Sequence, residues 1–190
     1  MATCISCDAC NPTITYNTLK YCKSCFDQMA TMFKKYSIDH EKNVDKTYQP
    51  PTKITNNVYI GSLNSVKKEH LTELNIRHII VAGRDLANEN HNGFNVLKLD
   101  IDDSFEQELG DSIRSANNFI ESVSSDSTCN NVLIHCYSGI SRSGSILLGY
   151  LIKKNKMSYD EAYDFVKKIY NPIFPNESFQ EQLREFAKQN

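Results

Sequence analysis

The sequence predicts an α/β fold with a largely parallel central sheet flanked by helices, and a small cysteine-rich module before it. From about Lys53 onward, short β-type runs alternate with longer segments of helical periodicity, which is the pattern of a parallel sheet with covering helices. Five of the seven cysteines lie within the first 25 residues, whereas Cys129 and Cys136 come more than a hundred positions later. This distribution predicts two modules with different chemistry.

Three segments are predicted along the 190 residues. Residues 1–36 form the cysteine-rich module, residues 37–52 form a polar linker that closes on Pro50 and Pro51, and residues 53–190 form the larger domain. With 40% hydrophobic residues, a chain of this length is expected to bury one core and a small appendage.

The charge balance excludes several partner classes. Lys and Arg number 21 against 23 Asp and Glu, so no overall basic field is expected to attract nucleic acid or an anionic membrane. The N-terminus lacks a basic region followed by an apolar run, and no segment approaches the roughly 18 apolar residues of a membrane span. We therefore expect a cytoplasmic protein, with a nuclear location left open.

The elements of the larger domain follow from periodicity and capping signals. Strands are expected at residues 58–60, 78–82, 95–99 and 131–135. A first helix is expected from a cap at Asn64 or Ser65 to Leu74, and a second carries the apolar face Ile113, Ala116, Ile120 and Val123. A third is expected over residues 141–155, and a fourth runs from the capping box of Ser158 and Glu161 to Asn171-Pro172. The last helix begins at the cap Asn176 and has Phe179, Leu183 and Phe186 on its apolar face.

The stretch HCYSGISRSG, residues 135–144, joins the last expected strand to a helix and is the candidate site. In open α/β sheets, ligands bind at the carboxyl ends of the strands, where Cys136 is expected. Gly139 permits a tight turn in which successive backbone N–H groups form an anion nest. Arg142 supplies a planar fork of donors that suits two phosphate oxygens. The expected phosphate-binding backbone is that of Tyr137, Ser138, Gly139, Ile140 and Ser141.

The same surroundings predict a reactive thiol at Cys136. A helix N-terminus and a neighbouring cation both stabilise a thiolate. A thiolate next to N–H groups and an arginine that bind phosphate predicts in-line attack of sulfur on phosphorus. Water then hydrolyses the resulting cysteinyl-phosphate. The alternative is an inert core cysteine, because free cysteine is among the most buried residue types. The joint pattern His-Cys-x-x-Gly-x-Ser-Arg-Ser at a strand-to-helix junction favours the reactive site.

This stretch resembles the signature loop of the cysteine-dependent protein tyrosine phosphatase superfamily, and its Ser-Arg-Ser ending is most similar to the dual-specificity branch. The resemblance extends from about Ile54 to the C-terminus. NVYIGSLNSV resembles the opening strand and turn of the family, and MSYDEAYDFVKKIYNPIFPNESFQEQL resembles its closing helices. Tyr170-Asn171 departs from the pattern, since many relatives have a basic residue before the proline.

The resemblance implies roles for several residues of the loop and its surroundings. It implies that Cys136 is the nucleophile, that Arg142 clamps the phosphate, and that Ser143 assists departure of the thiolate when the intermediate is hydrolysed. His135 matches a group that tunes the loop, although a structural histidine at a strand end explains it equally well. Asn176 matches a position that helps to hold the loop, and on local evidence it is a helix cap.

The proposed reaction also needs an acid to protonate the leaving oxygen. The segment LDIDDSFEQEL offers Asp100, Asp102 and Asp103. In the family the acid lies on a mobile loop and is followed by Ser or Thr, so the resemblance implies Asp103, which precedes Ser104. Asp102 is the rival, and the simplest alternative is that all three are solvated loop acids.

The N-terminal cysteines have the spacing of a zinc site. Cys4-x2-Cys7 and Cys22-x2-Cys25 are separated by 14 residues, which suits tetrahedral structural zinc, and Cys10 is an alternative ligand. The run YCKSCF resembles a zinc knuckle of the treble-clef type. A site closed by four thiolates is non-catalytic, so we expect the module to bind a protein partner or to shield part of the larger domain.

Three functions of different classes are compatible with these patterns. The leading one is a protein phosphatase acting on phosphotyrosine and also on phosphoserine or phosphothreonine, with no cofactor for catalysis. A phosphatase of RNA 5′ ends or inositol phosphates is the second, but the variable loop positions lack the extra basic residues that such charged substrates require. The third is a non-catalytic phosphate-binding adaptor, against which the presence of Cys136, Arg142 and Asp103 argues. Cys129 is expected to be a buried residue at a strand edge, with a redox role toward Cys136 as the weaker alternative.

Overall fold

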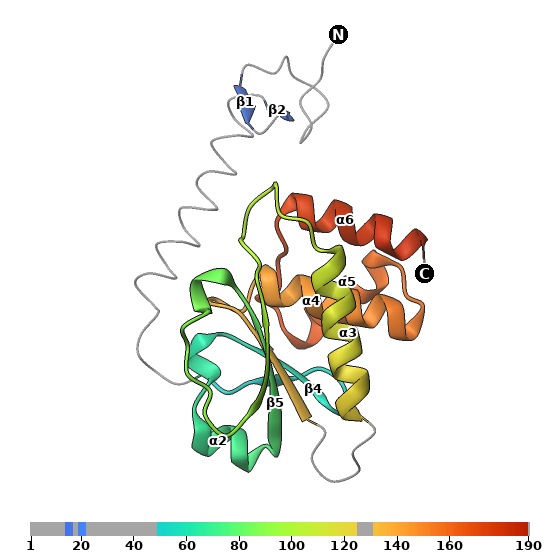
Figure 1. Ribbon diagram of the computed structural model, residues 1–190. Coiled ribbons are helices and arrows are strands. Elements are labelled where there is room, and N and C mark those ends of the chain that lie inside the picture. The colour runs from blue at the N-terminus through green and yellow to red at the C-terminus, as the bar shows by residue number, and fades with distance from the viewer. Residues whose placement is uncertain (1–13, 17–18, 22–48, 125–130, 190) are drawn as a thin grey trace. The chain divides into compact units, whose positions relative to one another are not determined.

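The chain divides into two units, which are described separately. The computed structural model describes residues 14–16, 19–21, 49–124 and 131–189 (Figure 1). The units are Met1–Thr47 and Tyr48–Asn190. In the first unit, β1 (Ile14–Tyr16) and β2 (Leu19–Tyr21) pair antiparallel. The five N-terminal cysteines and most of the predicted linker lie outside the described residues, so the predicted boundaries at residues 36 and 52 stay predictions.

A single five-stranded sheet forms the centre of the second unit. Its order is β3-β4-β7-β5-β6. The strands are β3 (Thr52–Lys53), β4 (Val58–Gly61), β5 (Ile76–Ala82), β6 (Asn95–Leu99) and β7 (Asn131–His135). Only the short β3 pairs antiparallel with its neighbour, and the three other pairings are parallel. The predicted largely parallel sheet is therefore confirmed, with β7 in its centre.

Helices cover both faces of this sheet, as the sequence predicts. They are α2 (Lys68–Glu73), α3 (Gly110–Ser124), α4 (Arg142–Asn155), α5 (Tyr159–Ile169) and α6 (Glu177–Lys188), with 3-10 turns η1 (Leu63–Ser65) and η2 (Arg84–Leu86). Figure 1 shows α3 to α6 together on one side of the sheet and α2 on the other. Within the described residues, no helix combines the length and the apolar character needed to cross a membrane.

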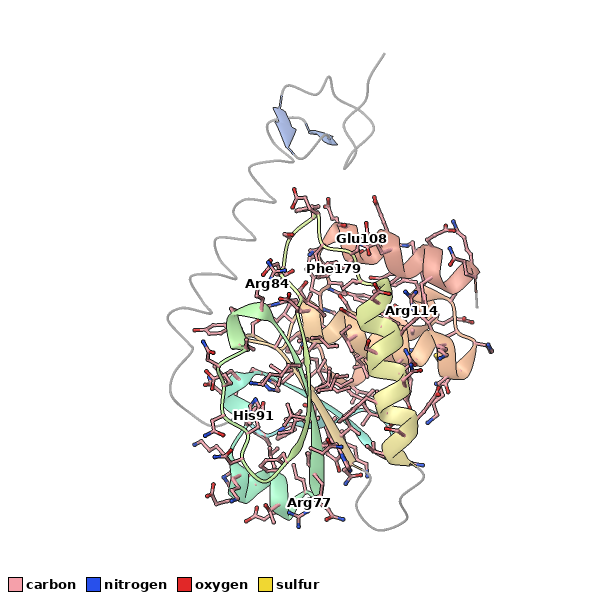
Figure 2. The ribbon with its side chains drawn as sticks, in the orientation of Figure 1. Arg77, Arg84, His91, Glu108, Arg114 and Phe179 are labelled. Carbon is pink, nitrogen blue, oxygen red and sulfur yellow. The ribbon has the colours of Figure 1, made fainter. Side chains whose placement is uncertain are left out.

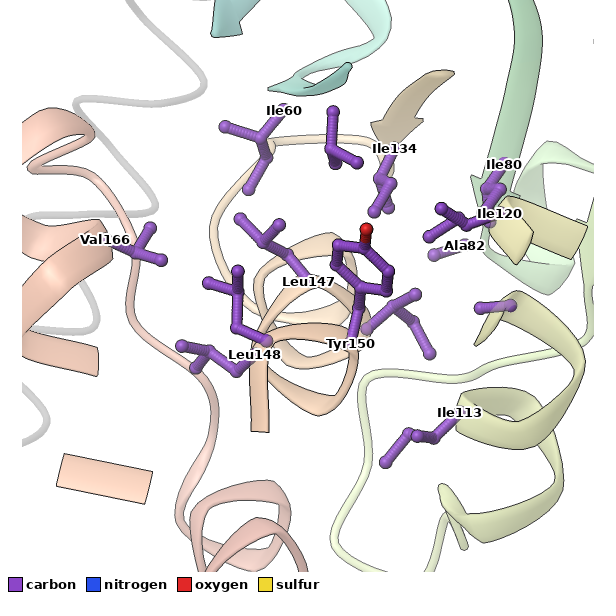
Figure 3. Packing of buried hydrophobic residues seen from close by; sticks show 14 of the residues in the cluster. Ile60, Ile80, Ala82, Ile113, Ile120, Ile134, Leu147, Leu148, Tyr150 and Val166 are labelled. Carbon is purple, nitrogen blue, oxygen red and sulfur yellow. The ribbon is translucent and has the colours of Figure 1, made fainter. Parts of the chain in front are cut away.

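Two apolar cores result from the alternation of side chains along the strands. Ile80, Ala82 and Ile134 point to the face covered by α3 to α6 (Figure 3), while Ile79 and Leu133 point to the face covered by α2. Because both faces are covered, the central strands read as nearly continuous apolar runs. The core thus fixes β5 and β7 side by side, and their carboxyl ends meet at one edge of the sheet.

Capping explains where α5 and α6 begin. The predicted capping box is confirmed: the N–H of Ser158 donates to Glu161 Oε2 at 2.8 Å, and the N–H of Glu161 donates to Ser158 Oγ at 3.3 Å. The cap at Asn176 is also confirmed, since its Oδ1 accepts from the N–H of Phe179 at 2.9 Å.

The predicted cap at Asn64 or Ser65 is wrong. Both residues lie inside η1, and α2 begins only at Lys68. The Oγ of Ser65 accepts a hydrogen bond from the N–H of Ser62 at 3.1 Å, so this serine closes a short turn instead of starting a long helix.

Candidate active site

The thiol of Cys136 lies where the central strand gives way to a helix. Cys136 directly follows β7, is 1% exposed, and precedes α4 by six residues. The N–H of Gly139 donates to its sulfur at 3.2 Å, and the hydroxyl of Ser143 lies 3.2 Å from the same atom. Donors and the α4 N-terminus therefore surround the sulfur.

The loop between Cys136 and Arg142 is held at both ends by backbone hydrogen bonds. The carbonyl of Tyr137 accepts from the N–H of Leu63 at 3.1 Å, and the carbonyl of Ile140 accepts from the N–H of Phe174 at 3.1 Å. The side chain of Tyr137 is half exposed, and Ser138 is half-buried beside it. The loop is thus attached to the segments after β4 and after α5.

Only glycine fits at position 139. Its φ of 78° lies in the left-handed region, which residues with a Cβ adopt at a cost. A Cβ there would also lie 2.9 Å from the carbonyl oxygen of Gly61 and 2.6 Å from the hydroxyl of Tyr170. Burial, followed by the charge of Cys136, raises the pKa of Tyr170 to about 12, so this hydroxyl stays protonated. The sequence left the role of Tyr170 open, and the structure places it against the loop.

Arg142 is buried at the start of α4 and points back toward the site. Its Nη1 and Nη2 donate to the two carboxylate oxygens of Asp85. Its Nε lies 3.9 Å from Asp103 Oδ2 and has no hydrogen-bond partner among the described residues. Burial lowers the pKa of Arg142, but the hydrogen bond to Asp85 and the charges of Cys136, Asp85 and Asp103 outweigh it and raise that pKa overall. The guanidinium therefore stays positively charged.

Asp103 contacts the loop directly. Its Oδ1 accepts from the hydroxyl of Ser141 at 2.7 Å and from Nδ2 of Asn176 at 2.9 Å. The backbone N–H of Asn176 in turn donates to Ser141 Oγ at 3.1 Å. These three residues form a closed ring of hydrogen bonds, which we call the Asp103 ring. Asn176 thus caps α6 and also holds the loop and Asp103.

The two other acids of the segment face elsewhere. Asp100 Oδ1 lies 2.5 Å from Arg84 Nε, and Asp102 Oδ2 lies 2.7 Å from Arg84 Nη1. Arg84, labelled in Figure 2, belongs to η2 at the carboxyl end of β5. Of the three candidate acids, only Asp103 has a contact with the loop, so the geometry favours it over Asp102.

His135 is completely buried behind the loop. Its Nδ1 donates to the carbonyl of Cys136 at 3.3 Å, and its ring meets that of His91 edge to face, with 5.4 Å between the ring centres. Burial, with a smaller contribution from the nearby His91, outweighs the hydrogen bond to Cys136 and lowers the pKa of His135 to about 4. A neutral His135 therefore supports the backbone of the loop and adds no charge beside the thiol.

The burial of His135 predicts a loss of stability in mild acid. Its folded pKa of about 4 lies below the ordinary 6.5, so between these values the unfolded chain binds more protons and stability falls as the pH falls. We expect the free energy of unfolding to be lower at pH 5 than at pH 7, with His135 accounting for about 2 kcal/mol of the difference. Urea denaturation at both pH values measures this difference in the free energy of unfolding.

The comparison uses His135→Gln, which cannot titrate, and His70→Gln, which removes a partly exposed histidine of α2. His135→Gln should reduce the pH dependence, and His70→Gln should leave it unchanged. An identical pH dependence in wild type and His135→Gln would contradict the assignment.

Two other groups of predicted residues have no described geometry. The predicted zinc ligands Cys4, Cys7, Cys10, Cys22 and Cys25 lie outside the described residues, as does Cys129. In the part of the chain that the structure describes, no three His, Cys, Asp or Glu side chains are grouped to hold a metal ion.

Sequence reasoning missed Asp85 and His91. A usable signal existed for Asp85, because it follows the carboxyl end of a predicted parallel strand, as Cys136 does. No local pattern marks His91, which lies in the loop between η2 and β6 (Figure 2). It reaches His135 only through the fold.

Comparison with known proteins identifies similar chains. Residues 58–189 match the family model described as the catalytic domain of dual specificity phosphatases. Dual specificity protein phosphatase 1-B of Xenopus laevis is 34% identical over 141 residues, which cover 73% of this chain and 37% of that protein. Putative tyrosine phosphatase 123R of Invertebrate iridescent virus 6 is 32% identical over 142 residues, which cover 73% of this chain and 92% of that protein.

A solved structure shows the same fold. A leucine rich repeat and phosphatase domain containing protein from Entamoeba histolytica is 27% identical, with a TM-score of 0.64 over 74% of this chain and 92% of that one. The chain spans little more than a third of the first curated relatives that it matches. Since the family model covers residues 58–189, which include the whole loop and every contact of Asp103 described above, the chain belongs to the dual specificity phosphatase family.

Proposed function

We propose that this protein is a protein phosphatase that hydrolyses phosphotyrosine and also phosphoserine or phosphothreonine through a cysteinyl-phosphate intermediate. The observation that carries the proposal is the convergence on one loop of a buried thiol, a buried charged guanidinium and an acid held by the Asp103 ring. The relatives named as dual specificity and tyrosine phosphatases support it.

In the first step the substrate phosphate binds to the loop N–H groups and Arg142. The Cys136 thiolate attacks phosphorus, so that a sulfur–phosphorus bond forms as the bond from phosphorus to the substrate oxygen breaks. Asp103 in its acid form gives its proton to that leaving oxygen. Ser141 and Asn176 keep the carboxyl at the edge of the loop, where the leaving oxygen emerges.

In the second step water releases the phosphate. Asp103, now a carboxylate, takes a proton from the water whose oxygen attacks phosphorus, and the sulfur–phosphorus bond breaks. The Ser143 hydroxyl, 3.2 Å from the sulfur, donates a hydrogen bond to the departing thiolate and so favours its release. Free inorganic phosphate then leaves, and the thiolate is restored.

The loop argues for a protein substrate over a more highly charged one. Between Cys136 and Ser143, the only cationic side chain is that of Arg142. A polyphosphate or an inositol polyphosphate carries several charges that need further basic partners. One phosphate on a neutral side chain matches a single guanidinium.

A substrate panel tests the proposal. Phosphate release by the full chain is measured on a phosphotyrosyl peptide, a phosphothreonyl peptide, an RNA with a 5′ triphosphate and inositol hexakisphosphate, with Cys136→Ser as the blank. We expect the highest kcat/KM on the phosphopeptides. Faster release from RNA or inositol phosphate would overturn the choice of substrate, and binding of phosphopeptide without turnover would support the adaptor instead.

The N-terminal cysteines are also proposed to bind one structural zinc ion, which folds a module for a protein partner. The support is the spacing of the two Cys-x2-Cys pairs, because four thiolates at such a spacing suit tetrahedral zinc. The cytoplasmic location stays a prediction.

Metal analysis of the purified chain tests the zinc proposal. We expect about one zinc per chain. Cys22→Ser should remove it, while Cys129→Ser should retain it. Of Cys4→Ser and Cys10→Ser, only one should lose zinc, which identifies the fourth ligand. Zinc well below one equivalent in the wild type would contradict the module.

A further inference from the structure

The carboxylate of Asp85, which lies outside the loop, binds the guanidinium of Arg142. Asp85 lies in η2, directly after β5, and β5 is the parallel neighbour of the strand that carries Cys136. Nη1 of Arg142 donates to Asp85 Oδ1, and Nη2 donates to Oδ2 at 3.3 Å. The side chain of Arg142 is 10% exposed and that of Asp85 is 50% exposed, so the pair lies at the border of the protein interior.

We propose that Asp85 is a positioning residue that aims the free edge of the Arg142 guanidinium at the substrate phosphate. The inference rests on the proposed function, because it assigns Arg142 to the phosphate. It extends that function to Asp85, a residue outside the signature loop whose carboxylate, among the described residues, accepts hydrogen bonds from Arg142.

The shape of the guanidinium supports this assignment. A guanidinium presents two edges for bidentate binding: one made by both terminal nitrogens, and one made by Nε and a terminal nitrogen. Asp85 takes the edge of the two terminal nitrogens of Arg142. The edge that contains Nε stays available, and it is the edge that a second oxyanion can take.

The free edge contains an unsatisfied donor. Nε of Arg142 is buried and has no hydrogen-bond partner among the described residues. It lies 3.9 Å from Asp103 Oδ2, so it faces the acid across the site. A buried charged donor without a partner is costly, and a phosphate oxygen is the partner that this site would supply.

The backbone at Gly83 passes close to the Arg142–Asp85 pair. A Cβ at Gly83 would lie 2.7 Å from Nη1 of Arg142 and 2.6 Å from Oδ1 of Asp85. Both atoms are the far ends of side chains, so a side chain at position 83 would push the pair aside. The chain therefore passes directly against the pair.

The competing explanation predicts the opposite change in oxyanion affinity when Asp85 is removed. If Asp85 only competed with phosphate for Arg142, its removal would free the arginine and tighten binding of an oxyanion. Simple charge repulsion predicts the same direction, because Asp85 is an anion beside an anion site. If Asp85 aims the guanidinium, its removal weakens binding despite the loss of a repelling charge.

The experiment measures tungstate affinity by titration calorimetry, together with kcat and KM on an aryl phosphate, at fixed ionic strength. Asp85→Ala should raise the dissociation constant for tungstate and KM by about tenfold or more, because a misplaced clamp loses oriented contacts. Asp85→Asn keeps the shape and one acceptor oxygen but replaces the other oxygen by an NH2 donor, so it should fall between Ala and wild type. The matched control is Asp111→Asn, which removes the carboxylate from another aspartate–arginine pair, with Arg114 on α3.

The same Asp85 substitution in an Arg142→Lys variant tests whether the effect of Asp85 on tungstate affinity depends on Arg142. Lysine has no planar fork to aim. Adding Asp85→Asn to Arg142→Lys should therefore change tungstate affinity by less than about twofold, since the two residues act as one unit. A merely structural role would give the same loss in both backgrounds. Thermal melting of each variant identifies any general loss of folding, in which case Asp85→Asn replaces Asp85→Ala in the comparison.

The outcomes separate this inference from the proposed function. Unchanged or tighter tungstate binding by the Asp85 variants, or an equal loss in the Arg142→Lys background, overturns the positioning role. Absence of turnover in the wild type overturns the proposed function, while the tungstate affinities still decide the role of Asp85.

Discussion

Replacing Cys136 with serine is expected to abolish phosphate release from both aryl phosphates and phosphopeptides, by at least about 10³-fold. The donors around position 136, the N–H of Gly139 and the Ser143 hydroxyl, are placed to stabilise a sulfur anion. A serine hydroxyl stays protonated in the same place and is a far poorer nucleophile. Initial rates of phosphate release measure the effect.

The serine variant should still bind. Arg142 and the loop backbone are untouched, so tungstate affinity is expected to change little, which separates loss of chemistry from loss of the site. Cys129→Ser is the matched control, since it removes the other cysteine of the larger unit and should keep normal rates. Turnover by Cys136→Ser comparable to that of the wild type would rule out the covalent mechanism.

Asp103→Asn is expected to lower kcat by about 10² to 10⁴-fold on a phosphothreonyl peptide, the range typical of a lost general acid. The loss should be much smaller on an aryl phosphate with an acidic phenol, because that leaving group departs without a proton. Asparagine keeps an oxygen that can accept from Ser141 and Asn176, so the Asp103 ring is largely preserved. Steady-state rates on the two substrates measure this difference.

Asp102→Asn supplies the control for Asp103. It makes the same change of charge one residue earlier. In the wild type, however, the carboxylate of Asp102 pairs with Arg84 instead of contacting the loop. We expect its kcat on both substrates to stay near that of the wild type. If Asp102→Asn lost activity and Asp103→Asn did not, the assignment of the acid would be reversed.

Much of the fold could be predicted because its signals are local. The strands and the later helices follow from apolar periodicity, and the caps at Ser158 and Asn176 from residues three positions apart. The start of α2 was wrong for an equally local reason: the Ser62–Ser65 hydrogen bond competes with the cap that Ser65 was expected to make.

The contacts around the site could be predicted only in part. The loop from Cys136 to Ser143 is one short motif, and its type was readable from the sequence. The partners of Asp103 at Ser141 and Asn176 lie 38 and 73 positions away, and Asp85 lies 57 positions from Arg142. Such pairs depend on which strands are neighbours and on how far each loop extends. The periodicity of apolar residues in the sequence predicts neither of these.

The Asp103 ring has a consequence for the order in which this protein matures on the ribosome. Its members come from the segment after β6, from the signature loop and from the cap of α6, so the ring cannot close until the last of them has been synthesised. Phe179 and Leu183 of the same helix complete the core behind it. On the proposed mechanism, we expect a nascent chain that exposes the thiol of Cys136 but has not yet folded α6 to lack an aligned proton donor.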